Sequence, residues 1–210
     1  MVQVTKEGYK AGAYAKLDRF ASYAIQTQLI LSTRPSSSLE VGVGDGIVSG
    51  YVRRHSDISY TTVDFAADLS PDIVADVRSL PFEDNSFDTV CAFQVLEHVP
   101  FQDFETCLRE LTRVAKNYVI ISLPHFSHPL KFSLKVPLIP EIKICIRLPH
   151  RKAHVFDGQH YWEIGKKGYS ASRIRRVLRS FGAIEREITP FENAAHHFFV
   201  LKAASINKFH

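Results

Sequence analysis

The sequence has little cysteine and no long apolar run. Its three cysteines, Cys91, Cys107 and Cys145, lie far apart and form no C-x-x-C pair, so we expect reduced, mostly buried thiols. No apolar stretch approaches the roughly 18–20 residues that a membrane-spanning helix needs. Residues 1–10 contain no apolar signal core. Together these absences predict a cytoplasmic protein.

The net charge is small, at +4, but it is unevenly distributed. Residues 131–180 contain 12 Lys and Arg against 3 Asp and Glu, whereas the rest of the chain is net acidic. A basic region of this kind either binds an anionic partner or is a solvated face. The hydrophobic fraction of 45% and the length of 210 residues predict a single folded domain, 1–210.

Strand-like and helix-like segments alternate along most of the chain. Such alternation predicts an α/β fold, with a doubly wound, mostly parallel sheet covered by helices on both faces. The last two strand-like segments are joined by few residues, which predicts an antiparallel C-terminal hairpin in a sheet of seven strands. The expected helices are 9–32, 46–55, 101–115 and 170–182, and the expected strands are 38–42, 58–64, 72–77, 87–93, 118–124, 183–189 and 196–203.

Residues 125–169 interrupt this alternation. They contain four prolines and five of the ten histidines of the chain. A connection of this length is more typical of a lid or a substrate-binding lobe than of a simple loop. We therefore expect an inserted lobe at 125–169, directly after the fifth strand.

The stretch LEVGVGDG, residues 39–46, follows the first strand, where open parallel sheets bind their ligands. It fails the dinucleotide fingerprint G-x-G-x-x-G/A because Ile47 occupies the last position, and no G-K-[S/T] follows it. Glu40 and Asp45 would repel a pyrophosphate but attract a cation. The loop therefore favours a ligand that has a nucleoside and a positive charge but no phosphate, such as S-adenosylmethionine.

The same loop resembles the first motif of class I S-adenosylmethionine-dependent methyltransferases, E-x-G-x-G-x-G, through Glu40, Gly42, Gly44 and Gly46. The stretch FDTVCAFQVLEHV, residues 87–99, is similar to the fourth-strand motif of the type 11 subgroup, which ends in L-E-H. The resemblance covers roughly residues 36–124. It implies the Rossmann-like methyltransferase fold, methyl transfer as the activity and S-adenosylmethionine as the cofactor.

Further cofactor contacts are expected beyond the glycine loop. Asp64 ends the second strand, where a carboxylate can accept hydrogen bonds from both ribose hydroxyls. The resemblance implies contacts at Phe65, beside the adenine, at Asp76 and Val77, along the adenine edge, and at Gln94, near the methionine part. Glu97 and His98 either serve the same motif or begin the next helix.

Residues of the predicted lobe are candidates for the acceptor side. His125 follows the fifth strand on the ligand side of the sheet, which makes it the candidate general base for a hydroxyl acceptor. The aromatic Trp162 either caps the substrate or anchors the lobe to the core, and His128 and His160 are further substrate candidates. The pair His125 and His128 with Glu163 lacks a zinc-site pattern, so no metal site is predicted. His196 and His197 are adjacent on a strand and should point to opposite faces.

The favoured function is methylation of a small molecule, at an oxygen of a sugar, of a lipid-linked compound or of a secondary metabolite. The apolar and basic residues of the lobe would also allow peripheral contact with a membrane. A protein or nucleic-acid methyltransferase is an alternative, although the [D/N]-P-P-[Y/F/W] motif of base methylation is absent, which makes a nucleic acid an unlikely partner. A non-catalytic S-adenosylmethionine-binding regulator is another. The oligomeric state and the acceptor atom (O, N or C) are left open.

Overall fold

The computed structural model describes residues 9, 15–148 and 152–203. Its centre is a seven-stranded sheet with the order β3-β2-β1-β4-β5-β9-β8. The strands pair in parallel except for β9, which is antiparallel to β5 and to β8. The strands are β1 (Ser37–Val41), β2 (Ser59–Asp64), β3 (Ile73–Val74), β4 (Phe87–Phe93), β5 (Ala115–Pro124), β8 (Gly182–Ile188) and β9 (His196–Ala203). The predicted doubly wound sheet with an antiparallel C-terminal hairpin is confirmed.

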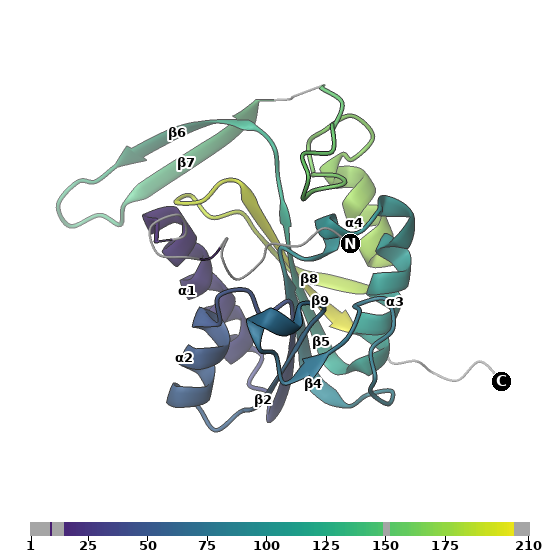
Figure 1. Ribbon diagram of the computed structural model, residues 1–210. Coiled ribbons are helices and arrows are strands. Elements are labelled where there is room, and N and C mark those ends of the chain that lie inside the picture. The colour runs from purple at the N-terminus through teal and green to yellow at the C-terminus, as the bar shows by residue number, and fades with distance from the viewer. Residues whose placement is uncertain (1–8, 10–14, 149–151, 204–210) are drawn as a thin grey trace.

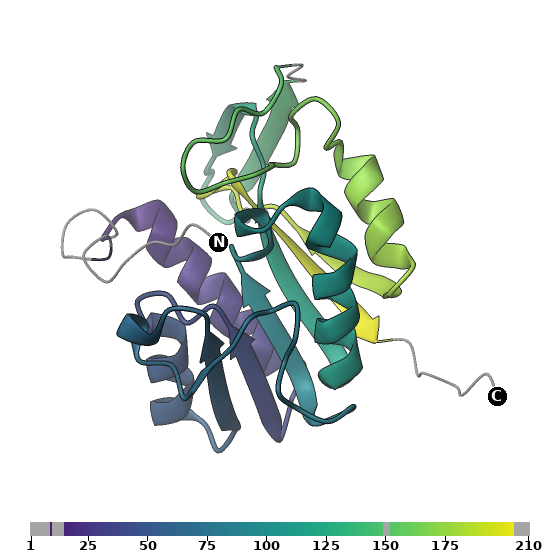
Figure 2. The same ribbon diagram turned by 45° about the vertical axis from the view of Figure 1, so that its right-hand side comes forward.

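Two pairs of helices cover the two faces of this sheet. Helices α1 (Leu17–Ser32) and α2 (Ile47–His55) lie on one side, and α3 (Phe104–Val114) and α4 (Ala171–Arg179) lie on the other (Figures 1 and 2). Each side has its own buried core, one packed around α3 and α4 and one packed around α1 and α2. The central strands β4 and β5 are buried on both faces because helices cover both, and this is why they appear in the sequence as continuous apolar runs.

Local chemistry explains where several elements begin and end. Ser170 begins α4 by accepting the Arg173 N–H at its hydroxyl, 3.2 Å away, which is a typical N-cap bond. The predicted helix 101–115 begins with a 3-10 turn at Phe101–Asp103 and becomes α-helical at Phe104. The predicted helix 9–32 is helical from Leu17, and its residues 10–14 lie outside the described part of the chain.

The predicted third strand, 72–77, is much shorter than expected. Only Ile73–Val74 pairs with β2. Asp72 accepts the backbone N–H of Thr62, and Asp76 accepts the backbone N–H of Arg78. These carboxylates compete with the strand for backbone donors, which is the usual reason why aspartate terminates regular structure.

The predicted lobe contains a two-stranded antiparallel hairpin, β6 (His128–Leu134) and β7 (Ile142–Leu148), which extends away from the main sheet as an arm (Figure 1). In the register Leu130–Ile146, Phe132–Ile144 and Leu134–Ile142, these apolar side chains share one face of the ribbon. The seven apolar side chains of this face are each 45–58% exposed: Leu130, Phe132, Leu134, Ile142, Ile144, Ile146 and Leu148.

The opposite, basic face of the hairpin contacts the body of the protein. Arg147 donates to the Thr189 hydroxyl at 2.9 Å and to the Ala194 carbonyl at 2.7 Å. Lys143 contacts the Glu192 carboxylate at 2.6 Å. The ribbon is therefore amphipathic with its charged face inward and its apolar face outward. None of the helices that the structure describes is long and apolar enough to cross a membrane.

Candidate functional site

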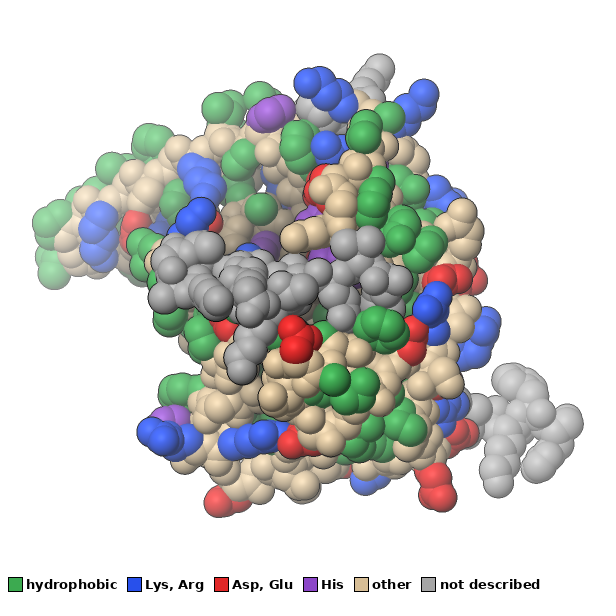
Figure 3. Space-filling model, viewed as in Figure 1, with side chains coloured by type: hydrophobic (Ala, Val, Ile, Leu, Met, Phe, Trp, Pro, Cys, Tyr) green, Lys and Arg blue, Asp and Glu red, His purple; other side chains and the backbone are tan. Residues whose placement is uncertain are grey.

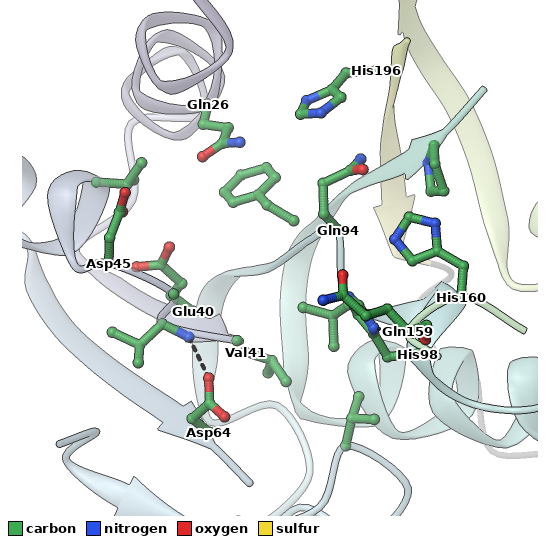
Figure 4. A pocket seen from close by; sticks show the side chains of 18 of the residues that line it. Gln26, Glu40, Val41, Asp45, Asp64, Gln94, His98, Gln159, His160 and His196 are labelled. Carbon is green, nitrogen blue, oxygen red and sulfur yellow. Dashed lines mark hydrogen bonds between the residues drawn. The ribbon is translucent and has the colours of Figure 1, made fainter. Parts of the chain in front are cut away.

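A cavity of about 430 Å³ opens where β1, β2, β4 and β5 end. This edge of the sheet lies at the change in strand order between β1 and β4, the position at which open α/β sheets bind ligands. Figure 4 shows Glu40, Asp45 and Asp64 on one side of the cavity and Gln94, His98 and His160 on the other. The predicted cofactor residues that line the cavity are Glu40, Gly42, Gly44, Asp64, Phe65, Val77 and Gln94.

The glycine loop is shaped by positions that exclude side chains. Gly42 has φ +86°, and a Cβ on it would lie 2.2 Å from Cγ2 of Val95, so a larger residue would both strain the backbone and clash. Gly46 has φ +73° and forms the N-cap of α2 without lining the cavity. Gly42 therefore lets the backbone pack against Val95, in the segment after β4, and Gly46 turns the chain into α2.

Glu40 is a buried carboxyl at the floor of the cavity. The Tyr60 hydroxyl donates to its Oε2 at 3.1 Å. Burial raises the pKa of Glu40 to about 8, and the hydrogen bond from Tyr60 opposes that rise. Nearby Asp45 accepts a hydrogen bond from the Tyr23 hydroxyl, and burial together with this bond raises the pKa of Tyr23. A cationic group that binds beside Glu40 would favour the ionised form of its carboxyl.

Asp64 joins the glycine loop to the end of β2. Its Oδ2 accepts the Val43 N–H at 2.9 Å (Figure 4), and its Oδ1 accepts the Ala66 N–H at 2.9 Å. Burial raises the pKa of Asp64, and these backbone bonds counteract the rise. A carboxylate has about four acceptor positions, so both oxygens keep the capacity to accept from a ribose diol. Phe65 is half-exposed and, like Val77, lines the cavity.

Asp76 is placed differently from the other predicted cofactor residues. It does not line the cavity, and its carboxylate is held by the Arg78 guanidinium at 2.7 Å. That hydrogen bond is the main cause of its lowered pKa. The neighbouring Val77 does line the cavity. A ligand in the cavity can therefore contact Val77 but not the Asp76 carboxylate.

Gln94 occupies an unusual conformation at the end of β4. Its φ is +56°, which is costly for a residue with a side chain. Two hydrogen bonds to Ser122 of β5 hold it, one from its backbone N–H to the carbonyl at 3.0 Å and one from Nε2 to the hydroxyl at 3.1 Å. Its side-chain position in the cavity is therefore fixed by the sheet itself.

His125 lies between the first cavity and a second one. The second cavity is basic, with Arg147, Lys166 and Lys167 among its lining residues. His125 and His197 stack, with their Nδ1 atoms 2.9 Å apart. Burial and the positive charge of Arg147 lower the pKa of His125 to about 3, so its ring is neutral at physiological pH.

A carboxylate sets the proton positions of this histidine pair. Nε2 of His197 lies 2.6 Å from Oε1 of Glu187, so this nitrogen carries the proton and donates it. Nδ1 of His197 is then an acceptor, and His125 must donate from its own Nδ1. The lone pair of His125 is thereby left on Nε2. The sequence predicts neither His197 nor Glu187 as a partner, because the contacts depend on the pairing of β9 with β5 and with β8.

The other histidines of the predicted lobe have different surroundings. His160 lines the first cavity, whereas His128 lies in the hairpin strand β6. Trp162 is fully buried, packs against Phe101 and Phe104, and donates to the Val99 carbonyl at 3.2 Å. Of its two predicted roles, the structure therefore gives Trp162 the one of anchoring the lobe to the core.

His196 and His197 face opposite sides of β9, as predicted, since His196 lines the first cavity and His197 lines the second.

Glu97 and His98 belong to a short 3-10 helix, Leu96–His98, and not to the beginning of α3. Glu97 is fully buried, and neither carboxylate oxygen has a hydrogen-bond partner among the residues of the described ranges. His98 lines the cavity beside His160, with ring centroids 5.1 Å apart. The sequence left the role of this pair open, and its contact with His160 is visible only in the structure.

Known proteins match both the sequence and the fold. Residues 39–122 match a family model described as a methyltransferase domain. This segment includes the glycine loop, Asp64 and Gln94, and it ends before His125.

Three solved structures are similar over most of the chain. The N-methyltransferase NodS from Bradyrhizobium japonicum WM9, in complex with S-adenosyl-L-homocysteine, has a TM-score of 0.63 and 10% identity, over 96% of this chain and 94% of its own. An S-adenosylmethionine-dependent methyltransferase from Mesorhizobium loti has a TM-score of 0.59 and 15% identity, over 89% and 100%.

The third structure is the 1,6-didemethyltoxoflavin-N1-methyltransferase from Burkholderia thailandensis, with bound 1,6-didemethyltoxoflavin and S-adenosylhomocysteine. It has a TM-score of 0.58 and 16% identity, over 90% of this chain and 78% of its own. At such low identities these similarities establish the fold.

Proposed function

We propose that this protein, a class I S-adenosylmethionine-dependent methyltransferase, methylates an oxygen atom of a small, amphipathic and anionic acceptor. The observation that carries the proposal is the position of His125, with its Nε2 lone pair, between the cavity of the glycine loop and a basic cavity. The similar methyltransferases from Bradyrhizobium and Burkholderia were solved with S-adenosylhomocysteine, and the latter also with a small-molecule substrate.

The residues of the first cavity fit the methyl donor. Asp64 has acceptor capacity for the ribose diol, Phe65 and Val77 offer apolar surface to the adenine, and the buried Glu40 suits the cationic methionine part. Gly42 lets the loop backbone pack against Val95, a contact that a Cβ would prevent. S-adenosylmethionine supplies an activated methyl group on a sulfonium and becomes S-adenosylhomocysteine when the acceptor takes that methyl.

His125 would receive the proton of the acceptor hydroxyl at Nε2. A hydroxyl oxygen becomes strongly acidic once a bond to carbon forms, so a neutral base of low pKa is sufficient at that stage. His197 would accept the Nδ1–H of His125 throughout, and Glu187 would hold His197 in position. The products are the methyl ether, S-adenosylhomocysteine and one proton passed from His125 to solvent.

The second cavity and the hairpin support an amphipathic acceptor. Arg147, Lys166 and Lys167 would attract an anionic group such as a phosphate. The outward face of β6–β7 presents seven exposed apolar side chains, and its tip adds the fully exposed Leu138. Hydrophobic side chains are visible along this arm in Figure 3. Exposed apolar surface of this extent typically marks an interaction site.

We propose that the apolar face of β6–β7 rests on an anionic membrane surface, from which a lipid-linked acceptor would be reached. Lys131 and Lys143 lie on the inward face, but the exposed Lys135, in the turn between β6 and β7, can meet phospholipid head groups, as expected of an interfacial element. Co-sedimentation with vesicles that contain an anionic phospholipid, against vesicles of phosphatidylcholine alone, tests this directly. Binding should fall in Phe132→Ser, and a stable dimer in solution that leaves vesicles unbound would refute it.

Calorimetric titration with S-adenosylmethionine and S-adenosylhomocysteine, with NAD as the control, is the first test of the proposed activity. Binding of both sulfur compounds without binding of NAD is the expected result. Incubation with the donor and candidate glycans or lipid-linked glycans should then add one methyl group to an acceptor oxygen, detectable by mass spectrometry. Methylation of protein or RNA in place of these acceptors would overturn the proposed substrate class.

A further inference from the structure

Three side chains at or behind the wall of the first cavity place possible metal-ligand atoms close together. One possible ligand atom from each of Glu97, His98 and His160 lies within 4.8 Å of the others. His98 and His160 line the cavity, whereas Glu97 is fully buried behind them. The Glu97 carboxylate has no hydrogen-bond partner within the described part of the chain. Burying a carboxylate without a hydrogen-bond donor costs free energy unless a positive charge lies next to it.

The hydrogen bonds of both histidines fix which ring nitrogen carries the proton. Nδ1 of His98 lies 3.1 Å from the Gln159 carbonyl, so it must donate. Nδ1 of His160 lies 2.8 Å from Oε1 of Glu163, which is also an acceptor when ionised. Both neutral rings therefore carry their lone pairs on Nε2. This arrangement, in which a carbonyl or a carboxylate holds the Nδ1–H of a histidine, is the usual outer support of a metal-binding imidazole.

We propose that Glu97, His98 and His160 form a binding site for a divalent transition-metal ion. Two imidazoles and one carboxylate are a donor set that suits ions such as Mn²⁺, Fe²⁺ and Zn²⁺. Glu163 and the Gln159 carbonyl are the outer partners that orient the two rings. The ion would supply the positive charge that the buried Glu97 lacks.

A second grouping of Asp157, His160 and Glu163 is geometrically possible but is less suited to a metal. Asp157 is exposed, and its Oδ1 already accepts the backbone N–H groups of Gln159 and His160. Glu163 already holds the His160 ring. Only the grouping with Glu97 contains a buried carboxylate that has no other partner.

The position of the site gives the ion a role toward the acceptor, and this part rests on the proposed function. His98 and His160 line the same cavity as Gln94 and His125. A metal ion there would bind acceptor oxygens directly and lower the pKa of a coordinated hydroxyl. The site would therefore select acceptors with two adjacent oxygen donors, such as a vicinal diol or a hydroxy acid, and would align one of them for methylation.

The test is titration of untagged, EDTA-treated protein with Mn²⁺ and, separately, with Zn²⁺, followed by calorimetry. The wild type should bind one ion, and Glu97→Gln and His160→Gln should each remove that binding. Glu163→Gln, which changes only the support of His160, should weaken it by about 10- to 100-fold. His55→Gln, at an exposed position in α2, is the control that should leave binding unchanged.

Circular dichroism of each variant shows whether it folds, and a thermal shift of the wild type with each ion provides a readout that needs no variant. Binding equal in the wild type and in folded Glu97→Gln, or no binding and no thermal shift with either ion, would overturn the proposal. Titration of the metal-free protein with S-adenosylhomocysteine separates the two hypotheses. Donor binding without metal binding refutes only the metal site, whereas loss of donor binding refutes the proposed function.

Discussion

We expect the buried carboxyl of Glu40 to make cofactor binding dependent on pH. Its pKa of about 8 means that the carboxyl is mostly protonated in the free protein at pH 6. In the proposed site, S-adenosylhomocysteine would bring its cationic amino group to this end of the cavity, and a cation favours the carboxylate. We therefore expect Glu40 to lose its proton on binding, so that low pH opposes binding.

The expected size of the effect follows from the fraction of the protein in which Glu40 is ionised. With a pKa of about 8, that fraction is roughly one in a hundred at pH 6 and about one half at pH 8. The affinity for S-adenosylhomocysteine should therefore rise about 50-fold over this range, or about 2.3 kcal/mol. The stability of the fold should depend on pH in the opposite direction. A raised carboxyl pKa stabilises the folded protein at low pH, and this contribution is lost as the pH rises from 4.5 to about 8.

Calorimetry at pH 6, 7 and 8, in buffers of different ionisation enthalpy, measures both the affinity and the protons released. Nearly one proton should be released per ligand bound at pH 6, and about half a proton at pH 8. Glu40→Gln is the matched control, since it cannot ionise and should show neither effect. An affinity that is independent of pH in the wild type, with no proton released, would refute the reasoning.

Three further predictions concern the loop, the ribose site and the histidine pair. Asp64→Ala should weaken binding of S-adenosylhomocysteine by about 1–3 kcal/mol, because it leaves polar groups without a partner; unchanged affinity by calorimetry would contradict the ribose assignment. Gly42→Ala should lower the free energy of unfolding by at least about 1–3 kcal/mol through backbone strain, as measured by thermal unfolding. Adding Val95→Ala to that variant removes the clash with Cγ2 of Val95 and should restore only the part of the stability that the clash costs. In the ¹⁵N NMR spectrum His125 should be the Nδ1–H tautomer, and His197→Phe should abolish that preference; an Nε2–H tautomer in the wild type would contradict the proposed base.

The sequence predicts the fold well, and most of the predicted cofactor residues line one cavity, because both depend on local patterns. Strand β4 lies at its predicted bounds, and Asp64 ends β2 as expected. The glycine loop is also predictable, since backbone conformation dictates the residue type there. The same local information misplaces Asp76, because a competing ion pair with Arg78 decides its direction.

The acceptor side depends on contacts between distant segments and is much less visible in the sequence. His125 meets His197 across 72 positions of the chain, and the meeting of Glu97 with His160 requires the lobe to fold back over β4. The inward basic face of β6–β7 is likewise decided by the loop after β8, with which Arg147 pairs. Composition gave the basic character of the lobe but not its orientation.

The burial of Trp162 has a spectroscopic consequence. The chain has one tryptophan, and its indole is enclosed by Phe101, Phe104 and Tyr169. All ultraviolet emission from tryptophan therefore reports on the contact between the lobe and α3. A ligand or a lipid surface that lifts the lobe from the core would shift this emission to longer wavelength, and one that leaves the lobe docked would not. The protein thus contains its own optical probe of the segment around Trp162, whose neighbours His160 and Glu163 line the first cavity.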